Sequence, residues 1–61
     1  LGRAEQSAAG LSLGQRVGHR KFGEGTVLAF EGDGARARIQ VNFDEAGSKW
    51  LIAGYAKLDP A

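Results

Sequence analysis

Residues 17 to 27 of this chain read Val-Gly-His-Arg-Lys-Phe-Gly-Glu-Gly-Thr-Val. The valines, phenylalanine and threonine in this stretch favour extended backbone, whereas its glycines mark places where the backbone bends sharply. The stretch therefore predicts one short strand, a turn at residues 22–25 and the beginning of a second strand.

Outward from this hairpin, the chain repeats the same pattern of short strands and tight turns. Hydrophobic patterning and turn residues predict strands at 15–20, 26–31, 35–43, 48–52 and 57–58, with a single helical turn at 53–56 before the last strand. Ten glycines and one proline suit a fold with many tight turns. We therefore expect an all-β fold, a small five-stranded SH3-like barrel, in which closure of the sheet protects the strand edges.

The strand at 35–43 shows the clearest alternation. Its odd positions from Ala37 to Phe43 are apolar, and its even positions from Arg36 to Asn42 are polar. Strict alternation is typical of a strand with one buried face. We expect the barrel interior to contain this apolar face and its neighbours: Val27 or Leu28, Phe30, Ile39, Val41, Phe43 and Leu51.

Length and composition limit the possible classes of protein. A chain of 61 residues is one domain at most, and its net charge of +1 does not single out a nucleic-acid binder. The absence of cysteine excludes disulfides and a cysteine-type zinc site. No apolar run approaches the ~18 residues of a membrane helix, so we expect no membrane contact. Residues 1–12 are predicted to be a flexible linker to an upstream domain, 13–59 the barrel and 60–61 a C-terminal tail.

Candidate catalytic residues are few. His19 is the sole histidine and is expected to be a surface strand residue, since no activating partner for a nucleophile is evident. The acidic residues fall in turns or at strand ends, so we expect neither a metal nor a cofactor. Four aromatic residues, Phe22, Phe43, Trp50 and Tyr55, either line a cation-binding cage or fill the interior, and we favour the interior. Trp50 is expected to be partly exposed at the barrel edge.

Four segments occur in the order found in one known family: His-Arg-Lys-Phe-Gly-Glu-Gly-Thr-Val, Gln-Val-Asn-Phe, Lys-Trp-Leu and Tyr-Ala-Lys-Leu. Over residues 13–58 the chain resembles the C-terminal Tudor-like domain of bacterial UvrD/PcrA-type DNA helicases. The resemblance implies the same barrel and a non-catalytic module that docks a DNA repair helicase onto the β subunit of RNA polymerase, coupling repair to transcription. It also implies a bacterial, cytoplasmic parent protein that is an ATP-dependent DNA helicase. The helicase activity is expected in that parent, because the chain itself lacks every helicase motif.

The resemblance places the family's principal polymerase contact at Lys49. We expect the partner-binding residues to be Lys49, Trp50, Arg20, Lys21 and Arg38, on a monomeric module. Two alternatives remain open: a nucleic-acid-binding barrel, with DNA as the main or a secondary ligand, and a structural tail that packs on the parent motor. In the first alternative, the residues that contact the phosphate backbone would be Arg16, Arg20, Lys21, Arg36 and Arg38.

Overall fold

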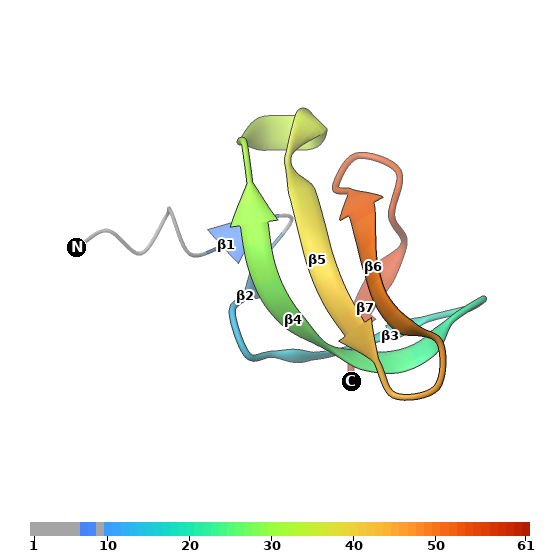
Figure 1. The fold of residues 1–61 in the computed structure, drawn as a ribbon. Helices are drawn as coiled ribbons and strands as arrows, with labels where there is room; N and C mark the ends of the chain where they lie inside the picture. Colours follow the sequence, from blue (N-terminus) through green and yellow to red (C-terminus); the bar gives the residue numbers. More distant parts are fainter. Residues whose placement is uncertain (1–6, 9) are drawn as a thin grey trace.

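The computed structural model describes residues 7–8 and 10–61, and almost all of its regular structure is strand (Figure 1). A two-stranded ribbon pairs β1 with β2, and the main sheet has five antiparallel strands in the order β6-β5-β4-β3-β7. The strands are β1 (Ser7–Ala8), β2 (Leu11–Ser12), β3 (Arg16–His19), β4 (Gly23–Glu31), β5 (Arg38–Phe43), β6 (Gly47–Ile52) and β7 (Leu58–Pro60), and the short 3-10 helix η2 spans Gly34–Arg36.

The sheet curls because its central strand is long and bent. β4 pairs with β3 through its first half and with β5 along most of its length. A shift of register between Val27 and Ala29 marks a bulge, which bends a strand and increases its twist. In Figure 1, β4 sweeps beneath β5, and β7 lies behind the front strands. The predicted all-β, five-stranded, SH3-like fold is confirmed.

The core lies inside this curl, and β5 contributes more of its buried residues than any other strand. The buried residues are Leu11, Val17, Val27, Ala37, Ile39, Val41 and Phe43. The predicted inward face of β5 is confirmed, and Val27 rather than Leu28 points inward, since Leu28 is 46% exposed. Phe30 and Leu51 are only partly buried and pack against the core cluster.

Several boundaries differ from those predicted. The turn expected at 22–25 lies at 20–22 instead, because residues 23–25 pair with β3 as the first residues of β4. The strand expected at 35–43 begins at Arg38, because residues 34–36 turn into η2 and Ala37 donates its N–H to the Gly34 carbonyl. Leu11, placed in the predicted linker, is buried in the core. At the other end, Pro60 lies opposite Val17 in the sheet and Ala61 donates its N–H to Arg16, so residues 60–61 are not a separate tail. The rest of the predicted linker, residues 1–6 and 9, lies outside the described residues.

The close pairing of β4 with β5 leaves no room for a side chain at Gly25. A Cβ atom placed there would lie 2.7 Å from the carbonyl oxygen of Asn42 and 2.8 Å from both Phe43 Cα and Val41 Cγ1. Two of these three atoms belong to the backbone, so the contact cannot be relieved by a change of rotamer. Gly25 is therefore required for the close approach of the two strands.

We expect Gly25→Ala to destabilise the domain by about 1–3 kcal/mol, the usual cost of overpacking. Thermal unfolding followed by circular dichroism measures the loss. Gly18→Ala is the matched control, because Gly18 also lies in a strand and a Cβ there would have no atom within 4 Å. Equal melting temperatures for the two variants would contradict the close packing described here.

A two-sided candidate interaction surface on strand β6

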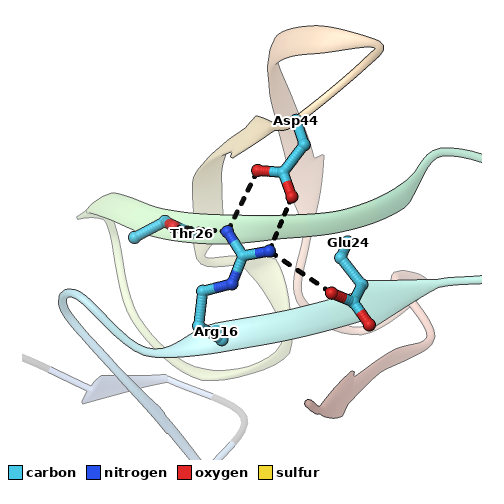
Figure 2. A network of polar contacts seen from close by, with 4 residues as sticks. All are labelled: Arg16, Glu24, Thr26 and Asp44. Carbon is cyan, nitrogen blue, oxygen red and sulfur yellow. Dashed lines mark hydrogen bonds and ion pairs between the residues drawn. The ribbon is translucent and has the colours of Figure 1, made fainter.

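The largest polar network among the described residues links β3, β4 and the turn between β5 and β6. Its central residue is Arg16, one of the cations that the nucleic-acid alternative requires. Arg16 on β3 makes two hydrogen bonds to Asp44, Nη1 to Oδ1 at 3.0 Å and Nη2 to Oδ2 at 2.6 Å (Figure 2). The same guanidinium donates to Thr26 Oγ1 at 3.1 Å and to Glu24 Oε1 at 3.3 Å. Arg16 is thus engaged within the domain. It lies on β3, which is separated from the edge strand β6 by β4 and β5.

This network perturbs the ionisation of Arg16 and Asp44. Hydrogen bonds from the Arg16 guanidinium hold the pKa of Asp44 below its usual value, and the two carboxylates raise the pKa of Arg16 in turn. A carboxyl group whose pKa is lower in the folded state stabilises the fold above its unfolded pKa. That contribution is lost as the pH falls through the folded pKa.

We expect Asp44→Asn to melt at a lower temperature than the wild type at neutral pH, with the difference shrinking as the pH falls below about 4, the usual range for aspartate. Melting curves at a series of pH values measure the effect. Glu45→Gln is the matched control, since Glu45 is exposed in the same turn and makes no ion pair among the described residues. A pH-independent difference between Asp44→Asn and wild type would show that the charge of Asp44 is not responsible.

An aromatic cluster closes one end of the core. The His19 ring stacks on Phe22 at 4.7 Å between centroids and meets Phe43 edge-on at 5.9 Å. His19 Nδ1 also accepts hydrogen bonds from the backbone N–H groups of Lys21 and Phe22, at 3.0 and 3.2 Å. His19 is therefore not the simple surface residue that was expected, because its imidazole organises the turn between β3 and β4.

Lys49 projects onto this aromatic cluster. It lies opposite Val41 in the β5–β6 pair, so its side chain is on the inner face of the sheet, and it is half-buried. Its ammonium lies 5.0 Å from the centre of the Phe22 ring, and that of Lys21 lies 5.9 Å from the same ring. Two ammonium groups thus flank one aromatic ring at the mouth of the barrel.

Trp50 lies on the other face. Its neighbours there are Gln40, directly opposite on β5, and Arg38, whose guanidinium lies 5.0 Å from the centre of the indole ring. Arg38 also forms an ion pair with Glu31. Trp50 is 43% exposed and Ile52, two residues along, is 44% exposed, so the outer face of β6 presents apolar surface beside a cation. The expectation that Trp50 is partly exposed is confirmed.

The five predicted partner-binding residues therefore fall into two groups rather than one patch. Lys21 and Lys49 each place an ammonium group near the Phe22 ring, and Arg38 lies over Trp50 on the outer face. Arg20 is exposed in the β3–β4 turn and has no ion pair in the described part of the chain. His19 and Phe22 were not among the partner-binding residues predicted from the sequence. The available signal in the sequence was the position of His19, two residues before Lys21 and three before Phe22. A side chain at this spacing can accept hydrogen bonds from the backbone N–H groups of the turn.

The four aromatic residues considered for a cation-binding cage do not converge. Phe22 and Phe43 pack together inside, with ring centres 5.2 Å apart, whereas Trp50 lies on the outer face. Tyr55, 83% exposed, lines a separate shallow groove of about 590 Å³ with the arginines 36 and 38 and with Ile52. Within the described ranges, no group of acidic residues and histidine could hold a metal ion, and no helix is long and apolar enough to cross a membrane.

Fold and surface together define a small antiparallel barrel of the SH3 and tudor class that exposes cationic and aromatic side chains on both sides of one strand. The PcrA/UvrD tudor domain family model matches residues 13–59, and the chain belongs to that family. It is a tudor domain of the kind found in DNA helicases, and such a domain is a non-catalytic module.

Individual relatives agree with the family match. The chain is 54% identical over 54 residues to DNA helicase II of Salmonella typhimurium and 52% identical over 54 residues to DNA helicase II of Escherichia coli, in each case over 88% of this chain and 8% of the relative. It is 33% identical over 49 residues to the ATP-dependent DNA helicase PcrA of Bacillus subtilis, covering 79% of this chain and 7% of that protein. The chain therefore spans less than a tenth of the length of these relatives.

Proposed function

We propose that this tudor domain docks a bacterial DNA repair helicase, working in the cytoplasm, onto the β subunit of RNA polymerase and so couples repair to transcription. The proposal rests on the family resemblance, which assigns the principal polymerase contact to the lysine of the Lys-Trp-Leu segment. In this chain that lysine is Lys49. The helicase activity belongs to the parent protein and not to this module.

One structural observation carries the proposal: the way Lys49 is presented. Its stem is half-buried against the core, and its ammonium is held over Phe22 with no carboxylate partner among the described residues. A positioned, unpaired cation loses little side-chain freedom when it binds a carboxylate on a partner. Trp50 on the same strand adds an exposed aromatic side chain of the kind enriched at binding hot spots.

The ion pairs of Arg16 and Arg38 within the domain weaken the nucleic-acid alternative. Of the five cations that it requires, Arg16 is bound to Asp44 and Glu24, and Arg38 is bound to Glu31. A backbone-tracking surface needs several cations free to replace the counterions of neighbouring phosphates. Two of the five are instead neutralised within the domain.

Titration of the isotope-labelled domain with RNA polymerase β fragments, and separately with single-stranded DNA, tests the proposal by amide chemical shifts. We expect shifts at the Lys49 and Trp50 amides with the polymerase fragments. The salt dependence of any DNA response serves as the control, since phosphate contacts weaken steeply as salt rises. Shifts with DNA alone would overturn docking to polymerase in favour of the nucleic-acid model.

A further inference from the structure

The side chains of Lys49 and Trp50 point to opposite faces of the sheet, because consecutive residues of a strand alternate. A partner lying flat against either face would meet only one of them. β6 is, however, the last strand of the sheet and is hydrogen-bonded to β5 alone. Only a partner that approaches the free edge of β6 meets both side chains at once.

The hydrogen-bond register shows which backbone groups of β6 face that edge. Asp44 donates its N–H to Glu24, and Ala53 donates its N–H to Ala37. In an antiparallel pair, hydrogen-bonded positions recur at every second residue, so Gly47, Lys49 and Leu51 direct their N–H and C=O groups toward β5. The backbone groups of Ser48, Trp50 and Ile52 therefore point away from the sheet.

These outward groups are available to a partner. Ser48, Trp50 and Ile52 are all exposed, and within the described part of the chain the sole backbone bonds to their outward groups are those accepted by the Ile52 carbonyl, from Tyr55 and Ala56. The helical turn after β6 thus caps the edge at that carbonyl. What remains is a short run of unpaired donors and acceptors from the Ser48 N–H to the Ile52 N–H, which is a template for an added strand.

We propose that the partner binds by adding one short extended segment to the edge of β6, between Ser48 and Ile52, and that this segment has an acidic residue flanked by two apolar residues. This inference rests on the docking function proposed above and specifies its geometry. The acidic side chain lies on the inner face near the Phe22 ring, whose centre is 5.0 Å from the Lys49 ammonium and 5.9 Å from that of Lys21. The two apolar side chains lie on the outer face beside Trp50 and Ile52.

Charge and polarity support this choice of partner. The inner mouth presents two cations without ion-pair partners in residues 7–8 and 10–61, so an acidic side chain there gains two attractions. On the outer face the exposed indole and the Ile52 side chain offer apolar contact, and Arg38 is already neutralised by Glu31. A matching strand therefore alternates apolar, acidic and apolar residues, since its side chains also alternate between faces.

Amide hydrogen exchange of the domain, alone and with RNA polymerase core enzyme, tests the geometry. We expect exchange at the Ser48, Trp50 and Ile52 amides to slow about ten-fold or more on binding, whereas the Lys49 and Leu51 amides, already bonded to β5, change less. Binding without protection at these three amides would overturn edge addition and leave docking intact. Protection that grows with protein concentration in the absence of polymerase would assign the edge to a second copy of the chain and overturn the proposal.

Failure to bind polymerase at all would refute the docking function. A peptide then tests strand addition at the β6 edge independently of docking. The probe is an end-blocked peptide Thr-Val-Glu-Val-Thr, with Thr-Val-Lys-Val-Thr as its control, each at millimolar concentration. Slower exchange at the three outward amides with the glutamate peptide, and not with the lysine peptide, supports edge addition. Unchanged exchange with both peptides would overturn it.

A variant pair isolates the backbone contribution. Ile52→Pro removes an outward N–H that bonds nothing in the free domain, and proline is tolerated where a strand's N–H faces solvent. Ile52→Ala removes the same side chain and retains the N–H. Among folded variants, we expect Ile52→Pro to bind polymerase about ten-fold more weakly than Ile52→Ala, and equal affinities would contradict a bond at this amide.

Discussion

Replacing Val41 by aspartate is expected to unfold the domain. Val41 is fully buried on the inner face of β5, between Ile39 and Phe43 along the strand. An aspartate at this position either buries an unpaired charge or is forced to take up a proton, and both cost several kcal/mol. A core in a chain of this size rarely supplies more than ~3–5 kcal/mol of net stability, so the substitution removes most or all of it.

Circular dichroism and the dispersion of amide proton shifts measure the outcome. Asn42→Asp is the matched control, because it introduces the same charge one residue along, where the side chain is exposed on the outer face. We expect the control to melt close to the wild type, within about 0.5 kcal/mol. A cooperative, wild-type-like melt for Val41→Asp would show that the inward face of β5 is wrongly assigned.

The second large effect is expected at Lys49. If its ammonium meets a carboxylate at the centre of the polymerase contact, Lys49→Ala should weaken binding by about 2 kcal/mol, which is about thirty-fold in Kd. Lys49→Glu should abolish detectable binding, because a like charge then faces the partner's carboxylate. Pull-down and titration with purified polymerase measure both effects.

Stability must be measured beside binding, because Lys49 is half-buried. Its ammonium lies 5.0 Å from the Phe22 ring centre, so its removal also loses a cation–π contact of about 0.5–1 kcal/mol. Lys57→Glu is the charge-matched control, since Lys57 is exposed in the connection to β7 and the same reversal there should leave binding unchanged. Folded Lys49→Glu protein that binds as tightly as the wild type would refute the site.

The site could be predicted only in part. Alternation along 48–52 correctly separates Lys49 from Trp50, and the resemblance names both residues. Neither indicates that the Lys49 ammonium lies over Phe22, because that contact joins the β3–β4 turn to an edge strand 27 positions later in the chain. The engagement of Arg16 with Asp44 was likewise outside sequence reasoning, since the two residues are 28 positions apart.

Residue types and their spacing along single strands were enough to predict the all-β class, the inward face of β5 and the family. Tertiary structure decided the rest. Leu11 belongs to the core, Leu28 is left outside it beside the β4 bulge, and β6 lies at the edge of the sheet. Each of these outcomes depends on which strands meet after the sheet curls, and contacts between distant segments have no local pattern in the chain from which they can be derived.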